Sequence, residues 1–546
     1  MRVLDNFHGG VHPPQHKDES TDRPIMVAPL PSHLVVPLHQ HIGQSAKPIV
    51  KVGEHVLKGQ MIGSAEGSVS AAVHAPTSGI VTAIDLHMTP HPSGLPDLCI
   101  SIQSDGKDEW IAHAPIDFRN MALPALRNYL RDAGVVGLGG AVFPSFIKLN
   151  AGPQQKIDTL ILNGAECEPW ITCDDMLMRE RADEIVRGIE IMRHLLQPAE
   201  ILIGIEDNKP EAIAAMQAAC ARAHFAVEVV PVPTIYPGGG AKQLTKVLTG
   251  KEVPSGARST DVGIQCFNVA TAYTVHRAVN LGEPVISRVV TITGNVVQPQ
   301  NFEALIGTPI EDLVHLAGGA KGDTNAYILG GPMMGFKLPS PSVPLVKAAN
   351  CVIASSPALF KPAPRTLPCI RCGRCAEACP VDLQPMDLYW FAHAKNFGKA
   401  QEYQLFDCIE CGCCDYVCPS HIPLVQYYRF AKSEIWAHEK EKQASDQARD
   451  RHEFRIFRQE REKQEKAEKL AQKTAAAKTA PSTEGNAEAD AKKAAILAAV
   501  ERAKAKKAGI TPKNVENLPP EAQHKIEEIE QKRAKLREMA HQKDDA

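Results

Sequence analysis

Features that would place this chain in a simple class of protein are missing from its sequence. No run of 18 or more apolar residues occurs, so the sequence offers no candidate for a membrane-spanning helix. The start, MRVLDNFHGGVHPP, has no apolar stretch behind a basic flank and lacks the pattern of a secretory signal peptide. The formal net charge is only -3, which gives no reason to expect nucleic acid as a partner. We therefore expect a cytoplasmic protein.

The cysteines are not spread along the chain as they are in small disulfide-rich proteins. Nine of the fifteen cysteines fall between Cys369 and Cys418, within a chain of 546 residues. Disulfide scaffolds are short, and their cysteines are distributed over the whole fold. A clustered and reduced set of cysteines instead indicates metal binding.

Two copies of one pattern, C-x2-C-x2-C-x3-C-P, account for eight of these nine cysteines. Three thiolates at this spacing can hold three corners of an iron-sulfur cube, and the fourth reaches across to the other cube. The pattern therefore predicts two [4Fe-4S] clusters, one held by Cys369, Cys372, Cys375 and Cys418, the other by Cys408, Cys411, Cys414 and Cys379. Zinc is the alternative, but zinc sites favour two separated C-x2-C pairs. Cys413 falls outside the shared spacing and is interpreted as a bystander.

The region upstream of the cysteines alternates short apolar runs with helical patterns. KIDTLILNG, AEILIGIED and FAVEVVPVP look like buried strands, and DDMLMRERADEIVRGIEIMRHLL and KPEAIAAMQAACARA look like helices. This alternation is typical of an α/β domain with a largely parallel sheet, which binds ligands beyond the carboxyl ends of its strands. Because 546 residues are too many for one core, we expect about three to five domains.

Three loops of this region are suited to a nucleotide or a flavin. GVVGLGGAVFPSFIKL and IYPGGGAKQL place glycines ahead of a helix start, where backbone N–H groups can approach a phosphate, and Lys148 adds charge to the first. A third loop, NGAECEPWITCDD, follows an apolar strand and carries four carboxylates that suit ribose or amide groups: Glu166, Glu168, Asp174 and Asp175. Each loop alone is also common without a ligand, but three in one domain favour a nucleotide or flavin site.

The same loops resemble the NADH-oxidising flavoprotein of respiratory complex I. GLGGAVFPSFIKL is similar to that family's GRGGAGFPTGLKW, and NGAECEPW is similar to its NADESEPG, within roughly residues 118 to 350. The resemblance implies NAD(H) contacts from Glu166 and Glu168, and FMN contacts from Gly137, Gly139, Gly140, Lys148, Asn163 and Asn268. The chain departs from the pattern at Ala165, which replaces an aspartate, and at Gly240 and Ala241, which replace a glutamate pair.

Longer phrases extend the resemblance to residues 1–430. ILNGAECEPWITCDD, YPGGGAKQL and QCFNVATAY, followed by the two Cys-Pro runs, are similar to the RnfC (or RsxC) family of Rnf-type electron transport complexes. That family implies a redox subunit that passes electrons between NAD(H), FMN and two [4Fe-4S] clusters to partner subunits, coupled to ion translocation. One partner is an iron-sulfur electron acceptor or donor. The protein would be peripheral on the cytoplasmic face of the inner membrane, held there by the other subunits.

Weaker patterns describe the flanking modules. Residues 47–85 have the rhythm of a lipoyl- or biotinyl-type barrel, but the stretch from Glu66 to Ala75 has no lysine for a swinging arm. Residues 288–319 resemble the soluble-ligand-binding β-grasp domain of complex I. After about residue 435 the chain is rich in Lys, Glu, Ala, Gln and Arg, so this tail cannot bury a core.

The expected fold class is therefore multidomain α/β. It comprises an N-terminal lipoyl-like β barrel-sandwich, a Rossmann-like α/β flavin domain, a β-grasp domain, a two-cluster ferredoxin-like helical module and a charged helical or disordered tail. The expected boundaries are 1–115, 116–285, 286–350, 360–430 and 435–546. The N-terminal histidines, His8, His12 and His16, are not expected to form a metal site, because prolines break any helix there.

Two other functions remain open from the residues. A stand-alone flavin and iron-sulfur reductase, such as a cobalamin reductase, shares this order of modules. A wiring subunit with a decayed nucleotide pocket would carry electrons and dock its neighbours without oxidising NADH. Ala165, Gly240 and Ala241 support this last interpretation.

Overall fold

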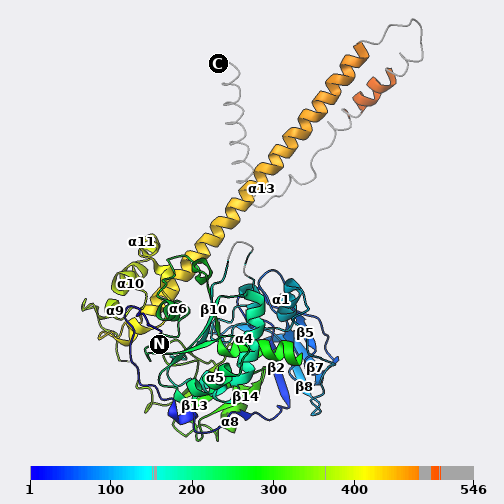
Figure 1. The fold of residues 1–546 in the computed structure, drawn as a ribbon. Helices are drawn as coiled ribbons and strands as arrows, with labels where there is room; N and C mark the ends of the chain where they lie inside the picture. The colour runs from blue at the N-terminus through cyan, green and yellow to red at the C-terminus, as the bar shows by residue number, and fades with distance from the viewer. Residues whose placement is uncertain are drawn as a thin grey trace. The chain divides into compact units, whose positions relative to one another are not determined.

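The computed structural model of the chain describes residues 2–150, 152, 156–362, 364–478, 494–502 and 505. The chain divides into two compact units, Met1–Lys442 and Gln443–Ala546. The first unit contains the sheets (Figure 1) and all the residues of the candidate site.

A parallel sheet carries the candidate nucleotide loops at its carboxyl edge. Its order is β11-β10-β9-β12, with β9 (Thr159–Gly164), β10 (Glu200–Glu206), β11 (Glu228–Val232) and β12 (Ile264–Asn268). Alternate side chains enter different cores: Leu160 and Leu162 face one side and Ile161 faces the other. Because both faces are apolar, both must be covered by helices.

Helices cover the two faces of this sheet (Figure 1). One face packs against α3 (Cys173–Glu180), α4 (Ala182–Leu196), α5 (Pro210–Ala221) and α7 (Val269–His276), and the other against α6 (Ala241–Thr249). The first glycine-rich loop lies between α1 (Leu123–Asp132) and α2 (Ser145–Lys148). Short helical turns complete the domain at η2 (Ser259–Val262) and η3 (Arg277–Leu281).

The N-terminal region forms two small sheets around one core. Their orders are β2-β8-β7-β4 and β3-β5-β6, and buried residues such as Val36, Ile62 and Ile100 fill the space between them. The strands are β2 (His33–Pro37), β3 (Lys47–Pro48), β4 (His55–Val56), β5 (Met61–Ser64), β6 (Val73–His74), β7 (Gly79–Met88) and β8 (Pro96–Ser104).

A mixed six-stranded sheet follows the parallel sheet in the chain. Its order is β1-β14-β13-β17-β15-β16, and it shares a core with α8 (Ile310–Leu316). The edge strand β1 (Met26–Val27) comes from the beginning of the chain, just after η1 (Asp18–Ser20). The other strands are β13 (Ser287–Gly294), β14 (Gln300–Leu305), β15 (Ala326–Leu329), β16 (Phe336–Lys337) and β17 (Cys351–Ser355).

The two cysteine runs lie in a small helical module with its own core. Its elements are α9 (Arg374–Glu377), α10 (Pro385–His393), α11 (Phe397–Glu402), η4 (Leu405–Asp407) and α12 (Cys413–Tyr416). Helix α13 (Leu424–Lys478) begins in this module, so the boundary expected near residue 435 falls inside one continuous helix of 55 residues.

Part of the tail predicted to be helical or disordered is described by the structure. Besides α13, residues 494–502 are helical. The segments 479–490 and 519–542 lie outside the described residues. Among the described helices, none combines the length and the apolar character needed to cross a membrane.

Gly188→Ala is expected to lower the melting temperature of the chain. Helices α4 and α7 pack so closely that a Cβ added at Gly188 would lie 1.8 Å from the Ala272 carbonyl oxygen, and overpacking costs about 1–3 kcal/mol. Gly398→Ala is the matched control, because this helical glycine in α11 has open space around its added Cβ. Equal melting temperatures of the two variants in calorimetry would contradict the close packing.

Candidate functional site

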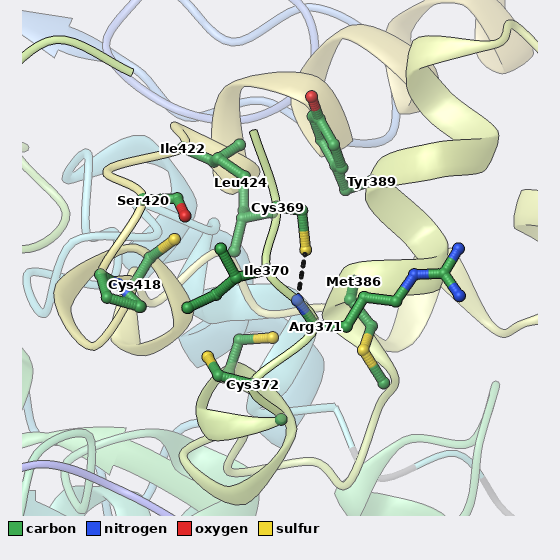
Figure 2. A pocket seen from close by; sticks show the side chains of 13 residues that line it. Cys369, Ile370, Arg371, Cys372, Met386, Tyr389, Cys418, Ser420, Ile422 and Leu424 are labelled. Atoms are coloured by element: carbon green, nitrogen blue, oxygen red, sulfur yellow. Dashed lines mark hydrogen bonds between the residues drawn. The ribbon is translucent and has the colours of Figure 1, made fainter. Parts of the chain in front are cut away.

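Four cysteines from both runs line one pocket of the helical module, here called the outer pocket. They are Cys369, Cys372, Cys375 and Cys418. The Cys369 Sγ accepts a hydrogen bond from the Arg371 backbone N–H at 3.4 Å (Figure 2). Met386 and Tyr389 from α10 complete part of the wall. The structure thus brings together the four residues that the sequence predicts for one cluster.

The other four predicted ligands line a second pocket, here called the inner pocket. They are Cys379, Cys408, Cys411 and Cys414. Backbone N–H groups donate to two of the sulfurs: that of Leu383 to Cys379 Sγ at 3.3 Å and that of Glu410 to Cys408 Sγ at 3.4 Å. Cys413 is fully buried beside Tyr236 and does not contribute to the wall of this pocket.

The chemistry of the two pockets suits iron-sulfur clusters. Each offers four sulfur donors, three from one run and one from the other, which is the ligation expected of two neighbouring cubes. Backbone N–H groups directed at sulfur stabilise negative charge on a thiolate. Burial raises the pKa of the Cys408 thiol to about 12. Burial thus favours the protonated thiol, and a bound cationic centre would favour the thiolate instead.

The predicted FMN loop offers exposed backbone at the edge of the parallel sheet. Gly139 and Gly140 are exposed, and an added Cβ at Gly140, where φ is +106°, would meet nothing within 4 Å. Gly139 lies against the Asn268 side chain, since a Cβ added at Gly139 would be 3.0 Å from the Asn268 Cβ. Within the loop, the Gly137 N–H donates to the Phe143 carbonyl at 2.9 Å. Backbone free of side chains beside an amide fits a phosphate or flavin site.

Lys148 and Asn163 are directed toward the protein interior. The Lys148 ammonium donates to the Cys266 carbonyl and lies 4.5 Å from the centre of the Phe267 ring. Burial lowers the pKa of Lys148. The Asn163 amide donates to the Gly239 carbonyl at 2.8 Å, which joins two of the predicted loops. In this arrangement Lys148 does not contribute its charge to the open loop.

Glu166 and Glu168, the predicted nucleotide contacts, also have internal partners. Glu166 accepts two backbone N–H groups from the first turn of α3, at 2.9 and 3.3 Å. Glu168 accepts the backbone N–H groups of Met333 and Met334 at 2.7 and 2.9 Å. These bonds fix the start of α3 and tie the loop to the segment between β15 and β16.

Asp174 is a buried carboxyl close to this site. Its Oδ2 accepts a hydrogen bond from the Asn268 amide at 2.6 Å, and its ligand atoms lie within 4.8 Å of those of Glu166 and Cys173. Burial, and then the charge of Glu166, raises the pKa of Asp174 to about 7. Asp174, whose carboxyl titrates near neutral pH, is thus hydrogen-bonded to Asn268, and Asn268 packs against the open glycine loop.

Two buried lysines, which no motif indicates, hold the loop from Glu166 to Ile171. Lys17 donates to three backbone carbonyls of this loop, at 2.6 to 2.9 Å. Lys209 donates to the Glu206 carboxylate at 2.5 Å and to the Glu166 carbonyl at 3.4 Å. Periodicity does not identify such residues either, because only the tertiary fold brings position 17 next to position 168.

Tyr236 connects the α/β domain to the inner pocket. Its side chain is 2% exposed, and its hydroxyl donates to the Cys411 carbonyl at 2.6 Å. Its backbone pairs with Val11 through hydrogen bonds of 2.8 and 3.0 Å. Tyr236, Val11, Cys411 and Cys413 form one buried cluster, against which Met333 packs. The inner pocket is therefore packed against the domain that carries the glycine loops.

Comparison with protein families finds four matches in the order of the observed modules. The RnfC barrel sandwich hybrid domain matches residues 5–107 and the Nuo51 FMN-binding domain residues 130–277. The SLBB domain matches residues 289–337 and the 4Fe-4S dicluster domain residues 368–422. These matches confirm the predicted order of a barrel-sandwich, a flavin-type α/β domain, a soluble-ligand-binding domain and a two-cluster module.

Several curated proteins of the RnfC family, named as parts of an ion-translocating oxidoreductase complex, are similar to the chain. One from Serratia proteamaculans is 48% identical over 464 residues, 85% of this chain and 65% of that protein. One from Yersinia pestis is 50% identical over 404 residues, 74% of this chain and 65% of that protein. One from Pseudomonas aeruginosa is 50% identical over 410 residues. The chain spans between 53% and 65% of the length of these relatives.

Among solved structures, an NAD+-reducing [NiFe]-hydrogenase in the H2-reduced state is 19% identical over 56% of this chain and 61% of its own, with a TM-score of 0.41. A likeness of this size supports no argument about function.

Asp174→Asn is expected to stabilise the chain more at pH 8 than at pH 5.5. The pKa of Asp174 rises from its ordinary 3.8 to about 7 in the folded chain. Between these values the folded chain holds a proton that the unfolded chain has lost, so the stability of the wild type falls as pH rises. Asparagine does not titrate and avoids this loss.

The measurement is the melting temperature of variant and wild type at both pH values. The difference, variant minus wild type, should grow from pH 5.5 to pH 8. Asp312→Asn, at an exposed position on α8, controls for removal of a surface carboxylate. A difference for Asp174→Asn that does not change with pH would contradict the assignment.

Proposed function

Because the chain belongs to the RnfC family of ion-translocating oxidoreductase complexes, we propose that it is the redox subunit of such a complex. It passes electrons between NAD(H), FMN and two [4Fe-4S] clusters and on to partner subunits, which couple the flow to ion translocation. Family membership confirms the identification made from the sequence. The observation that carries the proposal is the pair of four-cysteine pockets, the inner of which is packed, through Tyr236, against a flavin-type domain.

The cysteines hold the clusters in two crossed sets. We assign one cluster to the outer pocket, with Cys369, Cys372, Cys375 and Cys418, and the other to the inner pocket, with Cys408, Cys411, Cys414 and Cys379. Apolar side chains form part of both pocket walls, among them Ile422 and Leu424 in the outer pocket and Leu383 and Val425 in the inner pocket. Hydrogen bonds and solvent exposure around the sulfurs set the cluster potentials.

The exposed glycine loop supports an FMN site. The proposed contacts are Gly137, Gly139, Gly140, Lys148, Asn163 and Asn268, with Glu166 and Glu168 for NAD(H). FMN, when bound, exchanges two electrons with nicotinamide and single electrons with iron-sulfur clusters. Lys148 must leave the Cys266 carbonyl to reach a phosphate, and Glu166 must share its α3 hydrogen bonds with a nucleotide.

We infer that the inner pocket is nearer to the flavin site in the electron path. Tyr236 follows β11 on the carboxyl side of the parallel sheet and donates to the Cys411 carbonyl, so it bridges sheet and pocket. Val11 and Met333 exclude water around this bridge. Buried Lys432 donates to the Cys408 carbonyl at 2.6 Å and pairs with Glu410 at 2.8 Å, which places an ion pair beside the same pocket.

Several finer assignments are part of the proposal. We place the domain boundaries at 1–115, 116–285, 286–350, 360–430 and 435–546, with a lipoyl-like barrel, a Rossmann-like domain, a β-grasp domain, a ferredoxin-like module and a charged tail. The protein is peripheral on the cytoplasmic face of the inner membrane and is held there by partner subunits. One of those partners carries the iron-sulfur centre that accepts or donates electrons.

A wiring subunit that does not oxidise NADH is the second candidate. Specific observations favour it: Lys148, Glu166 and Glu168 are engaged inside the protein. The replacements Ala165, Gly240 and Ala241 also favour a subunit that does not oxidise NADH. The stand-alone reductase is not favoured, because the relatives found across most of the chain are named as parts of a complex.

The test is an anaerobic titration of the purified, FMN-loaded chain with NADH, followed by visible absorbance. The proposed function predicts bleaching of the flavin band followed by loss of iron-sulfur absorbance. Full iron-sulfur absorbance that NADH leaves unchanged, even with FMN added, would exclude NADH oxidation and support the wiring subunit.

Cys418→Ser and Cys379→Ser are each expected to disturb one cluster only. Cys418 contributes to the outer pocket and Cys379 to the inner pocket, although each belongs to the opposite cysteine run. Each variant should lose iron or change one of the two EPR signals, and the affected signal should differ between them. Cys413→Ser is the control and should keep the full iron content. Loss of iron in Cys413→Ser but not in Cys418→Ser would contradict the ligand assignment.

A further inference from the structure

The two cysteine runs have the same local backbone but different surroundings. Gly373 and Gly412 occupy equivalent positions with φ of +80° and +79°, and each precedes a short helix, α9 or α12. Arg371 and Glu410 are also equivalent, with φ of +55° and +57°. We call the turn from the second to the fourth residue after the first cysteine of each run its apex: Arg371–Gly373 in the first run and Glu410–Gly412 in the second.

The apex of the second run is covered by the rest of the chain. A Cβ added at Gly412 would lie 2.9 Å from the Met333 carbonyl oxygen. Cys411 is 6% exposed, and Ile409 packs into the cluster around Tyr236. The protein's own α/β and soluble-ligand-binding segments therefore cap this apex and connect it to the proposed flavin site.

The apex of the first run is open. A Cβ added at Gly373 would meet nothing within 4 Å, Cys372 is exposed, and Ile370 is 68% exposed. Leu367 is 53% exposed and donates its backbone N–H to Ser420, which lines the outer pocket. Figure 2 shows the Arg371 side chain extending away from the sulfurs of the pocket. The same turn that is capped in one run thus lies uncapped on the surface in the other.

The charges of the two apices also differ. From Cys369 to Cys379 the first run has two arginines and one glutamate, whereas from Cys408 to Cys418 the second has one glutamate and one aspartate. Glu410 is held by Arg429 and Lys432 at 2.8 Å each. Among the described residues, the guanidinium groups of Arg371 and Arg374 have no ion pair or hydrogen bond, and both residues are exposed.

We propose that the open surface around the outer pocket, formed by Leu367, Ile370, Arg371, Cys372 and Arg374, docks an iron-sulfur protein with an acidic face. This inference rests on the proposed function, and it names the partner of the outer cluster by its chemistry. A single electron passes from the reduced outer cluster to the oxidised cluster of the docked protein, which leaves the outer cluster oxidised and the docked cluster reduced, and no proton or bond is transferred.

The charge of this surface and its position beside the outer pocket favour an acidic iron-sulfur protein as its partner. Unpaired arginines bind carboxylates through paired N–H groups, so a carboxylate-rich face satisfies Arg371 and Arg374. Leu367 and Ile370 supply the apolar contact that excludes water from the junction. A bilayer of anionic lipid would also suit basic and apolar groups, but the surface directly borders a redox pocket, which a lipid surface would not use.

The test variant is Arg371→Glu with Arg374→Glu in the full, cluster-loaded chain. Its partner is a small acidic 2[4Fe-4S] ferredoxin, used as the probe. Charge reversal is expected to weaken ferredoxin binding, measured by calorimetry at low salt, at least tenfold, and to slow electron transfer by a similar factor. The wild-type rate should fall as salt increases, and the variant should lose most of this dependence.

Two controls separate this inference from the proposed function. Lys107→Glu with Lys321→Glu makes the same change of charge at exposed lysines outside the cysteine module and should bind ferredoxin like the wild type. The chain is also reduced with dithionite, the dithionite is removed, and electron transfer to the ferredoxin is measured. This measurement tests docking even if NADH fails to reduce the clusters. NADH reduction of the chain's own clusters tests the proposed function alone.

The outcomes are distinct. Ferredoxin binding that is weaker in the arginine variant than in both the wild type and the lysine control supports the docking surface. Equal binding by both variants, or loss of binding in the lysine control to the same extent, overturns it. Binding of the wild type to anionic lipid vesicles that the arginine variant loses, with ferredoxin binding unaffected, assigns the surface to lipid and also overturns it.

Discussion

The crossed sharing of cysteines is the constraint on which the redox module depends. Each pocket takes three sulfurs from one run and one from the other, so neither site exists until both runs are folded against each other. Helices on either side of the second run hold the module together: Tyr428 of α13 is buried and donates to the Pro385 carbonyl at the start of α10, at 2.6 Å. Cluster binding and folding of this module are therefore one process.

The second constraint is the attachment of this module to the α/β domain. Residues distant in sequence make that attachment: Val11 pairs with Tyr236, His8 bonds to the Cys379 carbonyl at 2.8 Å, and the Gly10 N–H donates to Ala378 at 3.1 Å. The first residues of the chain thus run between the sheet and the inner pocket. The same segment continues to Lys17, which fixes the loop of Glu166 and Glu168. One stretch of backbone therefore contacts both the proposed nucleotide loop and the inner pocket.

Residues with a local signature could be predicted from the sequence, and residues defined by tertiary contacts could not. The cysteine spacing identified the residues that line both pockets, and the strand and helix patterns identified the α/β domain, because each depends on short-range periodicity. Lys17, Lys209 and Tyr236 act through contacts with distant segments and leave no such signature. The inward orientation of Lys148 was also not predictable, because a motif gives the residue but not the direction of its side chain.

In the proposed electron path, the inner cluster lies between the flavin site and the outer cluster. Rapid freeze-quench EPR of the loaded chain after mixing with NADH tests this order, in the presence and absence of a dysprosium chelate that broadens solvent-accessible spins. The first cluster signal to appear is expected to be insensitive to dysprosium, and a sensitive signal, from the open outer pocket, is expected to follow. A dysprosium-sensitive cluster that is reduced first would contradict this order.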